Sequence, residues 1–147
     1  MTTVQQLLKE KPTGTWTISP RATVYQALEM MAEKDIGALI VVDDSGQVVG
    51  IFSERDYARK IVLLGRTSKT THVAELMVTK VFYVKPESTV EECMAVMTEK
   101  RTRHLPVLED GKLVGLVSIG DIVKAIIIDQ EITIRSLQNY ITGSYEA

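Results

Sequence analysis

The sequence is poor in the residues that disulfides and metal sites require. Its 147 residues include one cysteine, Cys93, and two histidines, His72 and His104. A lone cysteine excludes an intramolecular disulfide and is typical of a reducing compartment, so we expect a cytoplasmic protein. No cluster of cysteine, histidine and aspartate at metal-ligand spacing surrounds either histidine, and we therefore expect no metal site.

Strong basic charge and long apolar runs are also absent. The formal net charge is −2, whereas binding to nucleic-acid phosphates favours a basic domain. The apolar runs are short, such as Ala38–Val42, and far below the length of a membrane-spanning helix. Met1–Lys11 has polar residues where a signal peptide has its apolar core. We therefore expect neither a nucleic-acid partner nor a membrane partner.

The usual signatures of catalysis are missing as well. The sequence shows no nucleophile–base pair, no paired catalytic carboxylates and no Walker-type glycine loop. Its hydrophobic fraction of 45% is that of a folded globular chain. We therefore expect a folded protein that is not an enzyme.

What the sequence does contain is an internal repeat. Residues 20–61 align with residues 86–126, and 15 of the 41 aligned positions are identical. The offset is 66 up to Asp44 and 65 from Gly46 onwards, so the copies differ by one residue in an expected turn. Two copies of a unit too small for its own core should pack against each other. Clefts between such copies are common ligand sites.

Each copy begins with the same structural signals. A short β-rich segment, Thr15–Ile18 or Val81–Val84, precedes an apolar period of helical spacing. The first helix includes Val24, Ala27, Leu28, Met31 and Ala32 on its apolar face, and the second includes Val90, Cys93, Met94 and Met97. Thr23 and Thr89 directly precede these helices and are predicted to be their N-caps.

Each copy continues with a predicted hairpin and a second helix. The two apolar runs of a hairpin are joined by an acidic turn that contains glycine. The second run leads into a helix that begins at Ser53 or Ser118. The predicted fold is α+β, with tandem pseudo-symmetric strand–helix–strand–strand–helix units packed as one module. The predicted hairpin strands are Ala38–Val42, Val48–Phe52, Leu105–Leu108 and Leu113–Val117.

These signals divide the chain into four segments. Residues 1–64 form the first repeat, 65–72 a linker, 73–128 the second repeat, and 129–147 a C-terminal helix and tail. Residues 129–142 are predicted to be an extra amphipathic helix that ends at Gly143. Its apolar residues need a covering surface, so we expect a homodimer.

A Ser-x-x-Asp motif follows each hairpin. Ser53 and Asp56 form the first pair, and Ser118 and Asp121 form the second. The simplest interpretation is a capping box, in which the serine and the acid satisfy free amides at a helix start. A carboxylate at a helix N-terminus is favoured in its ionised form and accepts hydrogen bonds, which matches the two hydroxyls of a ribose. The serine and the helix amides suit a phosphate.

Basic residues gather near these motifs. Arg55 follows the first serine, while Arg103 and His104 precede the strand of the second copy. The guanidinium group matches a phosphate geometrically. The first copy has Gly37 and Ala38 at the corresponding positions, which supply no charge and leave room for a flat base.

The segment RHLPVLEDGKLVGLVSIGDIVKAI, from Arg103 to Ile126, resembles the CBS domain. The paired copies resemble a CBS pair, or Bateman module, of the stand-alone bacterial type, and the resemblance extends from about Val4 to Ile128. It implies that Asp56 and Asp121 bind ribose. It also implies ribose or phosphate contacts at Ser53, Ser118, Arg55, Arg103 and His104. The implied base contacts are Thr17, Ile18, Gly37, Ala38, Leu39, Lys80, Val81, Tyr83, Leu105 and Pro106.

In the family, base contacts and the ribose carboxylate come from opposite repeats. The resemblance therefore implies that Asp56 shares a cleft with Lys80–Tyr83 and Arg103–Leu105. It implies that Asp121 shares the other with Thr15–Ile18 and Gly37–Leu39.

Three functions remain open at this point. The first is a regulatory module that binds AMP, ADP, ATP or NAD(H) and signals energy or redox state to an unknown regulated protein by a conformational change. The second is a dimerising scaffold without a physiological ligand, in which the Ser-x-x-Asp pairs only cap helices. The third is a sensor of S-adenosylmethionine, whose sulfonium would avoid an arginine-rich cleft.

Overall fold

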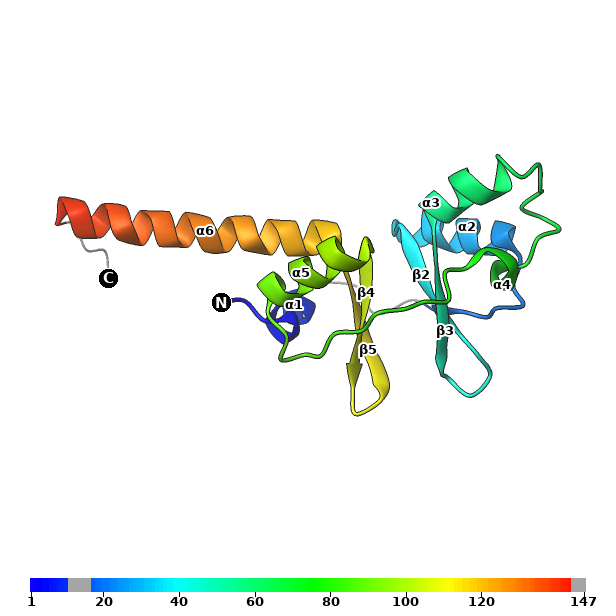
Figure 1. Ribbon diagram of the computed structural model, residues 1–147, viewed down its shortest axis with the longest axis horizontal. Coiled ribbons are helices and arrows are strands. Elements are labelled where there is room, and N and C mark those ends of the chain that lie inside the picture. Colours follow the sequence, from blue (N-terminus) through cyan, green and yellow to red (C-terminus); the bar gives the residue numbers. More distant parts are fainter. Residues whose placement is uncertain (11–16, 144–147) are drawn as a thin grey trace. The chain divides into compact units, whose positions relative to one another are not determined.

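The structure is a computed structural model that describes residues 1–10 and 17–143 (Figure 1). The described chain has two compact units. One unit is Gly14–Phe82, and the other combines Met1–Thr13 with Tyr83–Ala147. Thr15 and Trp16, which belong to the first predicted strand, lie outside the described residues.

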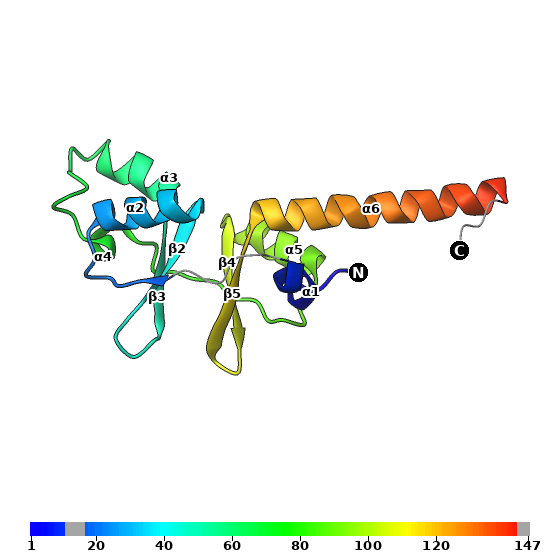
Figure 2. The same cartoon turned by 180° about the vertical axis from the view of Figure 1, so that it is seen from behind.

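The unit Gly14–Phe82 contains a three-stranded sheet in the order β1-β2-β3. The first two strands are parallel and the last two antiparallel. The strands are β1 Thr17–Ile18, β2 Ala38–Val42 and β3 Val48–Ser53. The helices are α2 Val24–Lys34, α3 Glu54–Asp56, the π-helix η1 Tyr57–Ile61 and α4 Val73–Leu76. Figure 2 shows the same elements from behind.

The second unit has a two-stranded antiparallel sheet. Its strands are β4 His104–Glu109 and β5 Lys112–Ser118. Its helices are α1 Val4–Glu10, α5 Val90–Lys100 and α6 Ile119–Thr142. The hairpins β2–β3 and β4–β5 therefore form as predicted, and the mixed α+β fold of tandem repeats is confirmed.

The predicted helix caps are present. Thr23 accepts a hydrogen bond from the backbone N–H of Gln26, and Thr89 accepts one from that of Glu92. On the predicted apolar face of α2, Val24, Ala27 and Met31 are buried and Leu28 is partly buried, whereas Ala32 is exposed. This pattern arises because α2 packs one stripe of side chains on the sheet.

Val81–Val84 does not form the predicted strand. Only Val84 pairs, through an isolated parallel bridge to Val107, in which the Val84 N–H donates to the Pro106 carbonyl. Extending this ladder toward Phe82 would require an N–H on Pro106, which proline lacks. The first repeat has Ile40 at this place, and β1 pairs with Ile40 and Val41.

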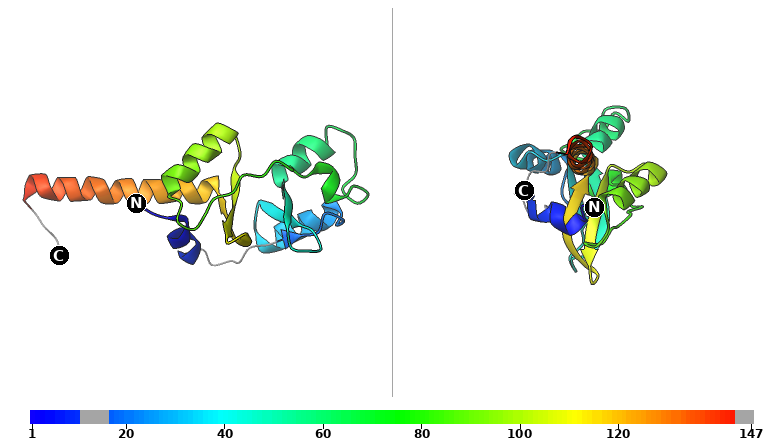
Figure 3. Two further views of the ribbon diagram at one scale, coloured as in Figure 1. Left: turned by 60° about the horizontal axis from the view of Figure 1, so that its bottom comes forward. Right: turned by 90° about the vertical axis from the view of Figure 1, so that its left-hand side faces the viewer.

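The predicted separate C-terminal helix is part of a longer one. Helix α6 runs without a break from Ile119 to Thr142, 24 residues. It ends as predicted at Gly143, which has a φ of 73°. The sequence between Asp121 and Thr142 contains no glycine or proline to interrupt it. The C-terminal half of α6 extends beyond the other elements of its unit (Figure 3).

Two short helices are exchanged between the repeats. Helix α1 lies at the start of the predicted first repeat but packs with the second, where the Val4 N–H donates to the Ser88 carbonyl. Helix α4 lies at the start of the predicted second repeat but packs with the first, where the Val73 N–H donates to the Ala22 carbonyl. The compact units are therefore divided differently from the repeat boundaries predicted from the sequence.

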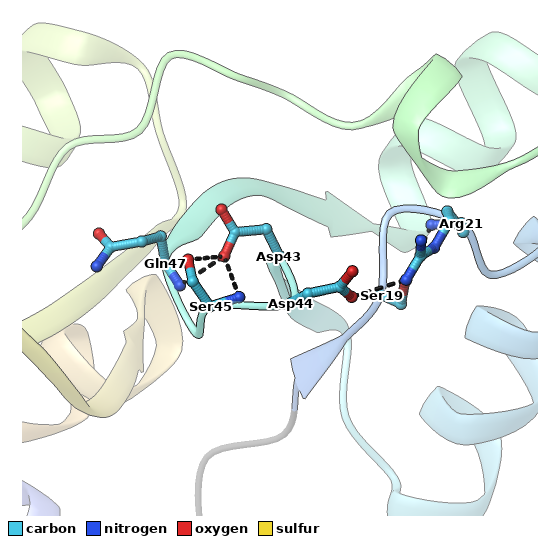
Figure 4. Close-up of polar contacts among 6 residues, drawn as sticks. All are labelled: Ser19, Arg21, Asp43, Asp44, Ser45 and Gln47. Carbon is cyan, nitrogen blue, oxygen red and sulfur yellow. Dashed lines mark hydrogen bonds and ion pairs between the residues drawn. The ribbon is translucent and has the colours of Figure 1, made fainter.

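The hairpin turns explain the one-residue offset between the copies. In the second repeat, Asp110 and Gly111 both have positive φ, of 51° and 77°, which is the geometry of a tight two-residue turn. The first repeat has a longer turn in which the Asp43 carboxylate accepts hydrogen bonds from Ser45 and Gln47 (Figure 4). The Ser45 hydroxyl is the main reason that the pKa of Asp43 is lowered.

Gly50 and Gly115 occupy equivalent strand positions where an exchanged helix comes very close. A Cβ on Gly115 would lie 2.6 Å from the Leu8 side chain. A Cβ on Gly50 would lie 2.7 Å from the Met77 sulfur and 2.9 Å from the Val78 carbonyl oxygen. The side chain of Leu8 can rotate away, but the backbone at Val78 cannot.

We predict that Gly50→Ala lowers the free energy of unfolding by about 1–3 kcal/mol, the usual range for overpacking. Gly115→Ala should cost less because it meets only the end of a flexible side chain. Gly37→Ala is the matched control, since a Cβ there meets nothing within 4 Å. Urea unfolding would rank the stability of the three variants. Equal stability of all three would contradict the close contact of Gly50 with Met77 and Val78.

Cys93 belongs to the core of the second unit and is fully buried. Burial raises the pKa of its thiol to about 11, with smaller contributions from Glu92 and Glu91. We predict that the native protein does not react with a thiol reagent at pH 8, and that one thiol per chain reacts once denaturant unfolds it. Rapid reaction of the native protein would show that α5 does not pack as described.

Candidate functional site

The first Ser-x-x-Asp motif forms a complete capping box at the junction of β3 and α3. One oxygen of Asp56, Oδ2, accepts hydrogen bonds from the backbone N–H and the hydroxyl of Ser53, at 2.9 and 3.0 Å. The backbone N–H of Asp56 donates in return to Ser53 Oγ at 3.4 Å. Only 14% of the Asp56 side chain is exposed. The carboxylate is therefore held in one orientation at the start of the helix.

The other oxygen of Asp56 lies beside a lysine. Asp56 Oδ1 is 3.6 Å from Lys60 Nζ, one helical turn further on. The same ammonium group donates to the Leu76 carbonyl at 2.8 Å. Lys60 thus joins the capping carboxylate to the end of the exchanged helix α4. In the second repeat Ala125 takes the position of Lys60, so the two junctions differ in charge.

The second motif repeats the cap at the junction of β5 and α6. The backbone N–H of Ser118 donates to Asp121 Oδ2 at 2.9 Å, and the backbone N–H of Asp121 donates to Ser118 Oγ at 3.2 Å. Both residues are partly buried. The structural interpretation of both motifs as capping boxes is therefore confirmed.

The neighbouring strand places different residues beside the two caps. Ala38 pairs with Ser53 across the first hairpin, and His104 pairs with Ser118 across the second. The Arg103 carbonyl also accepts a hydrogen bond from the N–H of Ile119, at 2.8 Å. The neighbouring strand therefore places Arg103 and His104 next to the second cap and the small uncharged Ala38 next to the first, whose basic neighbour is Lys60.

The predicted base contacts divide between side chains and backbone. Leu39 and Leu105 are fully buried in their units, so these residues can offer a ligand only their backbone atoms. Tyr83 is exposed and lines a cavity of about 680 Å³ with Lys85 and the β4–β5 turn. Pro106 is also buried, and its carbonyl is occupied by the hydrogen bond from Val84.

Each unit holds a subset of the predicted site residues. Unit Gly14–Phe82 holds the cap of Asp56, and the other unit holds the cap of Asp121 together with Arg103 and His104. The residues predicted in the first unit are Thr17, Ile18, Gly37, Ala38, Leu39, Ser53, Arg55, Asp56, Lys80 and Val81. The predicted sharing of each carboxylate with residues of the opposite repeat stays a prediction.

Two features of the site escaped the sequence analysis. Lys60 is one, although its spacing of four residues from Asp56 on a predicted helix is a recognisable signal. The other is the exchanged helix, whose signal is the pattern Thr-x-Val-x-x-Leu, present at Thr2–Leu7 and again at Thr71–Leu76.

Within residues 1–10 and 17–143, no group of three or more His, Cys, Asp and Glu residues could hold a metal ion. Among the same residues, no helix has the length and apolar character needed to cross a membrane.

The two α+β repeats, each with a serine–aspartate cap after its hairpin, define a paired-repeat module. Comparison with known families gives its name: the CBS domain matches twice, at residues 4–63 and 73–128. The chain belongs to the CBS domain family, and it carries a CBS pair. Pairs of this kind are regulatory modules.

Three relatives illustrate the range of similar proteins. The mitochondrial CBS domain-containing protein CBSX3 of Arabidopsis thaliana is 40% identical over 98% of this chain and 74% of its own length. A solved CBS-domain protein from Burkholderia ambifaria, assigned to signal transduction, is 56% identical with a TM-score of 0.82, over 88% of this chain and 96% of its own. A hexameric CBS-CP12 protein from bloom-forming cyanobacteria is 31% identical with a TM-score of 0.75, over 84% and 70%. CBS proteins of this kind thus include oligomers.

We predict that Asp56→Ala lowers the free energy of unfolding by about 1 kcal/mol, the usual cost of losing a helix cap. Asp56→Asn should cost less because its amide oxygen can still accept from the Ser53 N–H. Asp44→Ala is the matched control, since its carboxylate is 80% exposed and pairs only with the exposed Arg21 among the contacts described. Thermal unfolding would compare the three, and a larger loss for Asp44→Ala would contradict the assigned cap.

Proposed function

We propose that the protein is a regulatory module that binds an adenine nucleotide, AMP, ADP, ATP or NAD(H). The observation that carries the proposal is the fixed Asp56 carboxylate. Its Oδ2 atom is used by the cap, while Oδ1 meets Lys60 at 3.6 Å. A long ion pair of a partly exposed lysine is weak, so a ligand hydroxyl can replace it at little cost. The carboxylate is thus oriented before a ligand arrives.

The ribose of a nucleotide fits this chemistry. Its neighbouring hydroxyls are donors, and hydrogen bonds to a charged acceptor contribute about 1.5–3 kcal/mol each. The cap keeps the acceptor from rotating, which reduces the entropy lost on binding. The same reasoning applies to Asp121, whose Oδ2 is held by the Ser118 N–H. Each repeat therefore carries one prepared ribose ligand.

Basic residues near both caps favour a ligand with phosphates. Lys60 lies beside Asp56, and Arg103 and His104 adjoin the cap of Asp121. Lysine and arginine attract phosphate oxygens, arginine with a matching planar fork. These cations disfavour S-adenosylmethionine, because its sulfonium carries positive charge. Among the three functions left open by the sequence, the nucleotide module is therefore the best supported.

The proposed output is a conformational signal to a regulated protein. A ligand that prefers one conformation shifts the population toward it in proportion to its difference in affinity. We propose a binding role and no catalysis, and we propose that the protein works as a homodimer in the cytoplasm. The scaffold remains the competing function, because capping boxes stabilise helices without any ligand.

The test is isothermal titration calorimetry of the purified protein with AMP, ADP, ATP, NAD, NADH and S-adenosylmethionine. We expect at least one adenine nucleotide to bind. Asp56→Asn or Asp121→Asn should weaken that binding by about tenfold or more, as expected for the loss of a charge-assisted hydrogen bond. Asp44→Asn, in the turn of the hairpin that precedes α3, should leave the affinity unchanged.

The alternatives give different results. Binding of S-adenosylmethionine with no adenine nucleotide would support the third function. A protein that binds none of these compounds at millimolar concentration, and whose melting temperature none of them raises, would support the scaffold.

A further inference from the structure

The exposed side of α6 carries an apolar stripe of regular spacing. Six residues recur at alternating intervals of four and three along most of the helix, which is the heptad spacing of a coiled coil. They are Val123, Ile127, Gln130, Ile134, Leu137 and Ile141. We call this stripe the α6 seam. Its apolar members are exposed in the single chain, up to 81% at Ile141.

The seam does not coincide with the side of α6 that packs on its own unit. That side is marked by Ile122, which is fully buried, and by Asp129, which accepts hydrogen bonds from the N–H and hydroxyl of Thr2. The α6 seam lies on the adjacent side of the helix. An open groove of about 520 Å³, lined by Met1, Glu91 and α6, borders the seam at Gln130 and Ile134. The surface is thus accessible over its whole length.

We propose that the α6 seam is a dimerisation surface, and that a second copy of this chain binds it as a parallel two-stranded coiled coil. Positions a of the heptad hold Ile127, Ile134 and Ile141. Positions d hold Val123, Gln130 and Leu137. All three a positions are β-branched and one d position is leucine, and β-branched a residues with leucine at d favour two parallel strands. Helix α6 continues past its own unit and so presents the seam to another copy (Figure 3).

The polar member of the seam also favours the parallel pair. In a parallel coiled coil each layer pairs a residue with the same residue of the other copy, so the two Gln130 amides face each other and can exchange hydrogen bonds. In an antiparallel pair that used the same six layers, a residues face d residues. Each Gln130 would then face an Ile134 and bury an amide without a partner.

The charges beside the seam point the same way. The flanking e positions hold Lys124, Glu131 and Gln138, and the flanking g positions hold Ile126, Thr133 and Tyr140. A parallel pair places e beside g, so no like charges meet. The antiparallel pair places e beside e, and Glu131 would face its own copy. A repulsive contact of this kind discriminates against the wrong arrangement.

Oxidative cross-linking of the full chain tests the orientation. The background is Cys93→Ala, which removes the native thiol and places alanine where the first repeat has the buried Ala27. Ile141→Cys lies in the last layer, where the helix end can adjust to disulfide geometry. In a parallel pair the two introduced thiols meet, and we expect the cross-linked dimer to be the main product. Ser136→Cys, on another side of α6, is the matched control and should remain uncross-linked.

Three results would overturn the proposal. An antiparallel seam would leave Ile141→Cys uncross-linked, whereas the double variant Val123→Cys with Ile141→Cys would cross-link. A monomer in sedimentation at micromolar concentration, or a dimer in which neither variant cross-links, would show that the seam is not the interface. Leu137→Asp should abolish the cross-link through Ile141→Cys, whereas Ser136→Asp should not. Neither outcome depends on whether the protein binds a nucleotide.

Discussion

The close contact between a strand glycine and an exchanged helix is the constraint on which the rest of the structure depends. Gly115 lets Leu8 of α1 approach β5, and Gly50 lets Met77 of α4 approach β3. Helix α1 covers the core of the second repeat, and helix α4 covers the core of the first. The unit Gly14–Phe82 is one continuous segment, whereas the other unit needs both Met1–Thr13 and Tyr83–Ala147 and is complete only after the chain has passed through the first.

The same strands that carry these glycines lead directly into the caps. Three residues after Gly50 and Gly115, the chain reaches Ser53 and Ser118, where a hairpin strand becomes a helix. The helix start leaves amides without partners, and the serine and aspartate satisfy them. Packing therefore fixes the strand, the strand fixes the cap, and the cap fixes the carboxylate. The proposed binding of a ribose by Asp56 or Asp121 depends on these three constraints in turn.

The sequence predicted the elements whose causes are local. The caps at Thr23 and Ser118, and the hairpin turn at Gly111, follow from neighbouring residues and were found as expected. The prediction of a strand at Val81–Val84 was wrong because Pro106, on the neighbouring strand β4, lacks the backbone N–H that would extend the pairing beyond Val84. The residues of Val81–Val84 favour a strand, and nothing within this segment indicates that a residue elsewhere in the chain prevents one.

The site was predicted in part for the same reason. The aspartates and serines lie in one short motif, so their mutual geometry could be inferred. Lys60 joins Asp56 to Leu76 through a contact that only the packing of α4 creates. The two caps also differ in charge, because Ala125 takes the place of Lys60 in the second copy, and the similarity of the repeats drew attention away from this difference.

The central claim is that a fixed carboxylate recognises the neighbouring hydroxyls of a ribose. The most direct measurement is calorimetric titration with AMP, 2′-deoxy-AMP and 3′-deoxy-AMP, which differ only in those hydroxyls. If the claim is right, removing either hydroxyl weakens binding by about tenfold or more, as for the loss of a hydrogen bond to a charged group. Equal affinity for all three nucleotides would contradict it.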